Sequence, residues 1–280
     1  MAQFEGERPV LNERLDAIVR LPFLEDQTVI PVGVVSKDYV LVQHTTILDV
    51  VIQALDTAKI ATSDVKAELM ITAYGERMSL SLYLPDKYWF DPGDGHPMAM
   101  RLECLNSIDG STRFRALMGW FRFVCCNGLI IGVTRSDIRR RHIGDIQVQD
   151  IGKVLIWGIK ESDNEKKNFE KWRKTSVTLE QLASWAEGPL RKRWGFKAAT
   201  RAFHIARTGA DVDITAQYKG NTPTTISVKE QKPVPGMPKK SGNLYDVSQI
   251  LAWLAQERRD IQEQLEWREE IPELMHSLPN

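Results

Sequence analysis

Residues 65–85 read VKAELMITAYGERMSLSLYLP, and this stretch decides the fold class. After Gly75-Glu76, apolar residues alternate with serine or tyrosine at Met78, Leu80, Leu82 and Leu84. Before that pair, Leu69 and Ile71 alternate with Glu68, Met70 and Thr72. Two runs of period two joined by a Gly-X pair are typical of a hairpin with one buried face. The sequence therefore predicts that 65–84 forms an antiparallel hairpin turning at Gly75-Glu76, with Met78, Leu80, Leu82 and Leu84 buried.

A second hairpin is expected just downstream. MAMRLECLNS and TRFRALMGWFRFVC flank Ile108-Asp109-Gly110-Ser111. Asp-Gly supplies a positive φ at low cost, and Asn106 can bond to the backbone, so 106–111 is interpreted as a structural turn without a catalytic role. Upstream, residues 28–43 are predicted to form two β-rich runs around Ser36-Lys37-Asp38.

The remaining elements are mostly helical. Residues 45–60 show helical spacing, with Thr45 or Thr46 as the N-cap. Further helices are expected over 151–176, from Thr178 to Gly188-Pro189, over 196–207 and over 244–267, with a strand at 211–218. Thr178 and Gln181 form a capping-box pattern, and Gly188-Pro189 is expected to end that helix.

Strands with one early helix, followed by helices, predict an α+β protein. We expect a mostly antiparallel, hairpin-built sheet with the early helix packed on it and a helical C-terminal half. Residues 1–218 would form the core domain. Residues 219–243, with four prolines and five lysines, would be a loop or linker, and 244–280 an amphipathic C-terminal helix.

Composition excludes several protein classes. Apolar residues make up 42% and charged residues 26%, as in a globular protein, and 37 basic residues balance 37 acidic ones. Three cysteines, two of them adjacent, argue against a disulfide framework. No stretch approaches the roughly 18 apolar residues of a membrane span, and the N-terminus is unlike a signal peptide. We therefore expect a cytoplasmic protein of a bacterial host, with no membrane partner.

No catalytic motif stands out. The histidines are scattered, no Cys-x-x-Cys occurs, and Cys125 and Cys126 would point to opposite sides of a strand, which is a poor metal geometry. Neither a Gly-x-Ser-x-Gly elbow nor a phosphate-binding glycine loop is present. The acidic loop from Asp86 to Asp94 matches no calcium loop. We predict no catalytic residue, metal or cofactor, and favour a non-enzymatic role.

A basic cluster is the main candidate site. Residues 111–142 hold seven arginines against one acid, Asp137, interleaved with aromatic residues. Arginine beside exposed aromatic rings is typical of grooves for single-stranded nucleic acid. The candidate binding residues are Arg113, Arg115, Arg122, Arg139, Arg140 and Arg141, together with Arg191, Lys192 and Arg193 of a second basic stretch.

Charge pairing is the alternative. Residues 257–273 hold seven acids against three bases, so the arginines could fasten the C-terminal helix within one chain or between two. Alternation along the strands also turns several of the aromatic rings toward the core. The sequence leaves both interpretations open.

Several motifs resemble one known family. They are Tyr39, Val42 and Gln43; Asn106, Ser107, Asp109, Gly110 and Ser111; Arg122, Val124, Cys125, Asn127, Gly128 and Leu129; and Arg141-His142. In this order they resemble the plasmid and phage family called domain of unknown function 932, over roughly residues 33–145. The C-terminal Tyr245-Asp246-Val247 is similar to the ends of that family. The long, Trp-rich 150–215 region and the 219–243 segment depart from the pattern.

The resemblance implies a mobile-element setting and no settled biochemistry. Phage single-strand annealing proteins offer a fold-level analogy. The first hypothesis is an accessory protein that binds nucleic acid, with single-stranded DNA as the expected ligand. The alternatives are a protein-binding module acting on a host factor or host defence, suggested by eight tryptophans and the acidic C-terminal helix, and a small enzyme. A homo-oligomer fits the charge-pairing interpretation.

Overall fold

The computed structural model describes residues 2–5, 8–21, 28–125, 127–129, 138–140, 142, 147–220 and 222–278 of the 280-residue chain. The fold is α+β with antiparallel sheets, as predicted. The chain divides into two compact units, and the division passes through β7 (Met98–Ser107), β8 (Phe114–Arg122) and α2 (Asp150–Lys174). Unit 1 comprises residues 1–88, 100–118 and 135–160; unit 2 comprises residues 89–99, 119–134 and 161–280.

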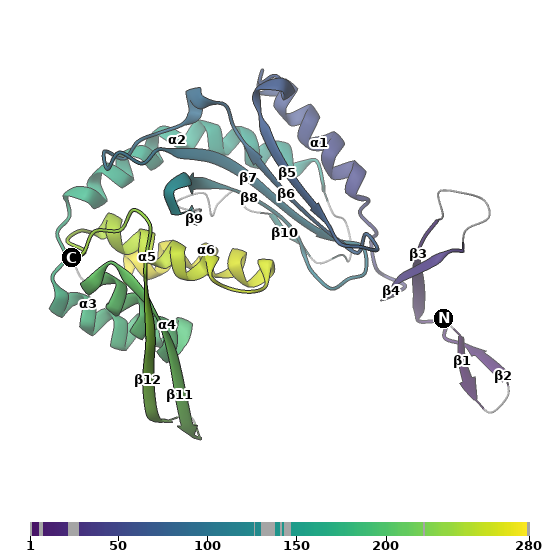
Figure 1. Cartoon of the computed structure of the whole chain (residues 1–280). Helices are drawn as coiled ribbons and strands as arrows, with labels where there is room; N and C mark the ends of the chain where they lie inside the picture. The colour runs from purple at the N-terminus through teal and green to yellow at the C-terminus, as the bar shows by residue number, and fades with distance from the viewer. Residues whose placement is uncertain are drawn as a thin grey trace. The chain divides into compact units, whose positions relative to one another are not determined.

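A six-stranded sheet is the largest sheet in the described part of the chain (Figure 1). Its order is β10-β8-β7-β6-β5, with β9 also paired to β8. The strands are β5 (Lys66–Ile71), β6 (Arg77–Tyr83), β7 (Met98–Ser107), β8 (Phe114–Arg122), β9 (Asn127–Leu129) and β10 (Ile138–Arg140). Every residue of β8 is buried, and β7 is buried at all positions except Glu103, so these strands form the centre of the sheet.

The predicted first hairpin is confirmed. Ile71 pairs with Met78, which places the turn at residues 72–76, and Gly75 adopts a φ of 84°. The four alternating residues from Met78 to Leu84 are buried. In the first strand, Leu69, Met70 and Ile71 are 46%, 62% and 51% exposed, so the alternation there does not mark a buried face. β5 lies at an edge of the sheet, so β6 alone supplies the buried face.

The turn after β7 is held by its own side chains. Ser107 Oγ donates to Thr112 O at 3.0 Å and accepts from Thr112 N at 3.1 Å, while Asp109 Oδ1 accepts from Ser111 N at 3.0 Å. Gly110 has a φ of 76°. Tyr39 Oη donates to Ser107 O at 2.8 Å. These contacts agree with the predicted turn chemistry.

Helix α1 (His44–Thr57) and the first part of α2, up to Lys160, pack within unit 1. Helix α1 buries Ile47, Val50 and Leu55, as its spacing predicts, but its N-cap is Gln43 and not a threonine. Helix α2 (Asp150–Lys174) places Gly152 against Ala54 of α1, and a side chain at Gly158 would overlap Met118 of β8. Glycine is a poor helix former, but at Gly152 and Gly158 the lack of a side chain allows close packing.

A helical segment follows in unit 2, and Gly195, with a φ of 82°, introduces a kink within its last helix. Helix α3 (Leu179–Trp185) has the predicted capping box of Thr178 and Gln181. The predicted end at Gly188-Pro189 is wrong, because a π-helical turn (Ala186–Leu190) carries the chain into α4 (Arg191–Thr208). The wider turn accommodates Pro189, which would otherwise clash with the preceding helical turn.

Residues 219–243 are not simply a linker. They include all of β12 (Thr222–Pro233), which pairs with β11 (Ala210–Lys219) in a long hairpin that extends past α3 and α4 (Figure 1). The expected single C-terminal helix is two helices, α5 (Leu244–Gln256) and α6 (Ile261–His276). Asp260 starts the second by accepting from Gln262 N and Glu263 N.

The N-terminal strands form two small hairpins. Strand β1 (Ala2–Glu5) pairs with β2 (Arg8–Leu11), and β3 (Leu15–Arg20) pairs with β4 (Ile30–Ser36). The prediction that residues 28–43 form two strands is therefore half right: β4 is present, but its partner lies upstream.

Gly110→Val should destabilise the protein by about 1–3 kcal/mol, the usual cost of forcing a side chain into a strained backbone region. A Cβ at Gly110 would also lie 3.4 Å from both Tyr39 and Val35. Urea denaturation measures the change. Gly188→Ala is the control, because nothing lies within 4 Å of that Cβ position. Equal stability of wild type and Gly110→Val would contradict the turn assignment.

Glu165 should make stability depend on pH. Its burial, with the nearby negative charge of Glu161, raises its pKa to about 8. The folded state therefore keeps a proton that the unfolded chain releases near pH 4.3, so stability should fall between about pH 4.5 and 8, by at most ~1.4 kcal/mol per pH unit. Glu165→Gln should flatten this dependence in melting experiments, whereas Glu170→Gln, on an exposed residue, should not.

Candidate nucleic-acid interface

The predicted arginine cluster divides in the structure. Arg115 is completely buried and Arg122 is 1% exposed, so neither belongs to an exposed surface; Arg113 is half-buried. In the backbone of β10, Arg139 pairs with Arg115, and Arg140 pairs with Phe114. The side chains of Arg139 and Arg140, and all of Arg141, lie outside the described residues. The backbone register brings only part of the cluster together.

The second basic stretch begins α4 and is exposed. Arg193 contacts Glu270 at 3.3 Å and Glu273 at 2.6 Å, both on α6. The Arg191 guanidinium lies 5.4 Å from the ring centre of Phe196. Charge pairing with the acidic C-terminal segment is thus present at Arg193, while Lys192 is exposed to solvent.

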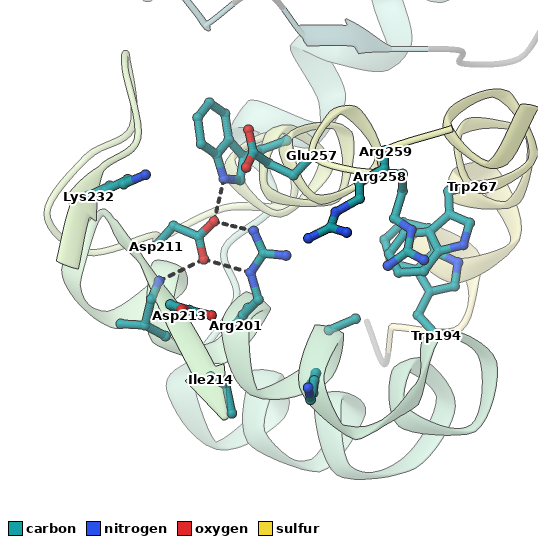
Figure 2. A pocket seen from close by; sticks show the side chains of 14 residues that line it. Trp194, Arg201, Asp211, Asp213, Ile214, Lys232, Glu257, Arg258, Arg259 and Trp267 are labelled. Atoms are coloured by element: carbon teal, nitrogen blue, oxygen red, sulfur yellow. Dashed lines mark hydrogen bonds and ion pairs between the residues drawn. The ribbon is translucent and has the colours of Figure 1, made fainter. Parts of the chain in front are cut away.

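A cleft of about 760 Å³ in unit 2 brings together cationic and aromatic side chains that the sequence analysis did not select. Its lining comes from α4, from the base of the β11–β12 hairpin and from the region where α5 is followed by α6 (Figure 2). The charged and tryptophan residues are Trp194, Lys197, Arg201, Asp211, Asp213, Lys232, Trp253, Glu257, Arg258, Arg259 and Trp267.

The Asp211 carboxylate joins three of these elements. Arg201 of α4 donates two hydrogen bonds to it, one of 2.9 Å from Nε. Trp253 Nε1 of α5 donates at 2.8 Å, and Val212 N donates at 2.7 Å (Figure 2). Burial alone would raise the pKa of Asp211, but the hydrogen bonds from Arg201 and Trp253 outweigh it and hold the pKa below its usual value. Asp211 therefore stays charged and fixes this part of the cleft.

Three planar groups form another wall. Trp194 and Trp267 stack with centroids 4.3 Å apart and planes at 18°, and the Arg258 guanidinium lies 4.5 Å from the Trp267 ring centre. Trp194 and the Arg258 guanidinium therefore both lie against Trp267. Glu263 accepts from Arg258 at 3.0 Å, and Glu270 accepts from Trp194 Nε1 at 2.7 Å. The stack is thus held at both ends.

The cleft carries a net positive charge. Five cationic side chains line it against three acidic ones. Arg201 and Arg258 are paired with acids, whereas Lys197, Lys232 and Arg259 are exposed and make no ion pair with another described residue. Such an arrangement can bind an anion at the rim and a planar group against Arg258. Across the described residues, no group of three or more histidine, cysteine or acidic side chains could hold a metal ion.

The comparisons with known proteins extend the resemblance seen in the sequence. The family model described as domain of unknown function (DUF932) matches residues 31–246. The chain belongs to this family. The DUF932 match continues beyond the motifs near residues 33–145 and includes the Trp-rich region, β11, β12 and the start of α5.

Two curated relatives come from Escherichia coli strain K12. The UPF0380 proteins YfjQ and YafZ are 42% and 40% identical to this chain over 65 residues, which is 23% of this chain and 24% of each relative. The chain thus spans about a quarter of the length of these relatives. No solved structure matches the chain significantly. Among the described helices, none combines the length and apolar character needed to cross a membrane.

Sequence reasoning missed the cleft because its residues are distant along the chain. Trp194 and Trp267 are 73 positions apart, and Arg201 meets Asp211 only because α4 packs beside β11. The tryptophans and the basic Arg191–Trp194 stretch were visible signals. No local pattern links them to Trp253 or Lys232.

Asp211→Asn should destabilise the protein by about 3 kcal/mol, because it leaves a partly buried guanidinium without its charged partner. Asp213→Asn is the matched control, since that residue lies two positions along the same strand with an exposed side chain. Urea denaturation of both variants measures the difference. If the two variants lost the same stability, Asp211 would not have the organising role that its contacts indicate.

Proposed function

We propose that this DUF932 protein binds single-stranded nucleic acid, most simply single-stranded DNA, in the cleft of unit 2. The observation that carries the proposal is the combination of rim cations with the Arg258–Trp267–Trp194 stack. Phosphates attract lysine and arginine regardless of sequence, and bases stack on planar side chains.

The rim supplies the electrostatic part of the proposed binding. Lys197 lies on α4 one turn before Arg201, and Lys232 lies on β12. Arg259 follows Arg258 in the segment between α5 and α6 (Figure 2). A phosphate backbone that followed this rim would release counterions, which favours binding at low salt. The acids Asp211 and Glu263 are engaged by Arg201 and Arg258, so their charge is largely compensated.

The stack supplies the preference for single strands. Trp194 stacks on Trp267 and the Arg258 guanidinium lies over the same residue, so a base would stack on the guanidinium from the cleft. Base–aromatic and base–arginine stacking require an unpaired base, because the bases of a duplex are already stacked on each other. A duplex would offer this cleft only its phosphates.

Fluorescence anisotropy with a labelled oligothymidine at about 50 and about 200 mM salt tests the proposal, and affinity should fall steeply with salt. The combined variant Lys197→Gln, Lys232→Gln, Arg259→Gln should bind more weakly. Its salt slope should be flatter by about 2, because each phosphate contact contributes roughly 0.7 on a single strand.

The matched control removes three exposed lysines from α2: Lys167→Gln, Lys171→Gln and Lys174→Gln. It changes net charge equally and should bind like wild type. Arg139→Gln, Arg140→Gln, Arg141→Gln tests the cluster that the sequence selects. If that variant alone lost affinity, binding would lie at β10 and not in the cleft. Absence of binding at both salt concentrations would overturn the proposal.

A further inference from the structure

A second cleft lies elsewhere in unit 2 and has a different character. It has a volume of about 570 Å³, within the usual range for small-molecule sites. Its lining comes from the 94–96 loop, the ends of β8 and α2, and residues 236–249. The polar residues are Asp94, His96, Arg122, Arg173, Lys240, Asn243, Asp246 and Gln249. Two segments that carried the family resemblance, at Arg122 and at Tyr245-Asp246, meet here.

The two arginines of this cleft each donate a hydrogen bond to the backbone of a neighbouring loop. Arg122 contacts Asp94 at 2.6 Å and donates to Gly236 O at 3.2 Å, and a Cβ at Gly236 would lie 2.8 Å from Arg122 Nη1. Arg173 donates to Pro92 O, and a Cβ at Gly93 would lie 2.5 Å from its Nη1. Both glycines have positive φ, 91° at Gly93 and 70° at Gly236. The two loops are thus shaped around the guanidinium groups.

The 94–96 loop is itself rigidly organised. Asp91 Oδ1 accepts from the backbone nitrogens of Gly93, Asp94 and Gly95, at 2.7, 3.2 and 3.3 Å. Asp94 Oδ1 accepts from His96 N at 3.0 Å, while Oδ2 contacts Arg122. This pattern fixes the backbone of His96 at the cleft. The acidic loop of the sequence is therefore built of internal turn contacts.

The charges of the cleft leave an excess of cations. Asp94 is paired with Arg122, and Asp246 Oδ2 accepts from Gly242 N at 2.9 Å. Burial raises the pKa of Asp246, although the positive charges of Arg173 and Arg122 oppose the shift. Against these two acids stand Arg122, Arg173 and Lys240, with the His96 ring beside them. Lys240 is exposed and has no ion pair among the described residues.

We propose that this cleft binds the phosphate group of a small molecule, with Arg173, Lys240 and His96 as the direct contacts. A tetrahedral anion has several acceptor oxygens, which suits donors that approach from α2, from the 94–96 loop and from the segment before α5. Arg122 and Asp94 hold the lining in place. The ligand is distinct from the nucleic acid proposed for the first cleft.

Titration calorimetry with inorganic phosphate and with pyrophosphate, at constant ionic strength in chloride, tests this proposal. Wild type should bind at least one of the two. Because a hydrogen bond to a charged group contributes enough for roughly a tenfold change in affinity, Lys240→Gln and Arg173→Gln should each weaken binding by about tenfold. Arg173 also holds the 92–93 loop, so the exposed Lys240 gives the cleaner variant.

The control is Lys239→Gln, which removes the adjacent exposed lysine that does not line the cleft. Equal weakening by Lys239→Gln and Lys240→Gln would mean general attraction to a cationic surface and would overturn the proposal. No binding of either anion would also overturn it. Binding of the labelled oligothymidine, made without a terminal phosphate, should be unchanged in Lys240→Gln. The two proposals can therefore fail separately.

Discussion

The burial of β8 is the constraint from which much of the structure follows. Every residue from Phe114 to Arg122 is buried, and two of them are arginines. A guanidinium group removed from water must be paired or hydrogen-bonded, because an uncompensated buried charge costs several kcal/mol. Arg122 meets this requirement through Asp94 and Gly236 O, which belong to segments far apart in the sequence. The strand thereby connects two loops that come from distant parts of the chain.

Internal pairing explains how a chain with no net charge presents cationic clefts. Arg193, Arg201 and Arg258 each contact acids of unit 2. Charge pairing and anion binding were alternatives in the sequence, but the structure assigns pairing to particular residues and leaves others at the rim. A zero net charge therefore says little about local fields, since paired and exposed cations count equally in the sum.

Local sequence patterns predicted where strands form better than they predicted which strand residues are buried. The alternation from Met78 to Leu84 determines which side of β6 is buried, because a slip of one residue would expose all four side chains. Leu69 and Ile71 show the same alternation, yet they are exposed because β5 has a neighbour on one side only. The position of a strand in its sheet is decided by distant pairing, and alternation contains no information about it.

Prolines misled the sequence interpretation for a related reason. Pro223 and Pro233 lie at the ends of β12, in a two-stranded hairpin where each strand has a free edge and a missing N–H costs little. Pro189 lies in a π-helical turn. Composition alone cannot distinguish such tolerated positions from a linker.

Likewise, the sequence identified Arg122 as a candidate by its residue type, but its burial and its pairing with Asp94 depend on tertiary packing.

The two clefts use paired charges in the same way. A salt bridge such as Arg201–Asp211 adds little attraction for a ligand, because its charges already compensate each other. Its contribution is geometric: it holds α4, β11 and α5 so that Lys197, Lys232 and the Arg258 stack face one space. Only the exposed cations can then contribute to the salt dependence of binding, and the planar stack contributes the part that salt does not screen. Affinity that persisted at high salt would therefore have to come from the stack.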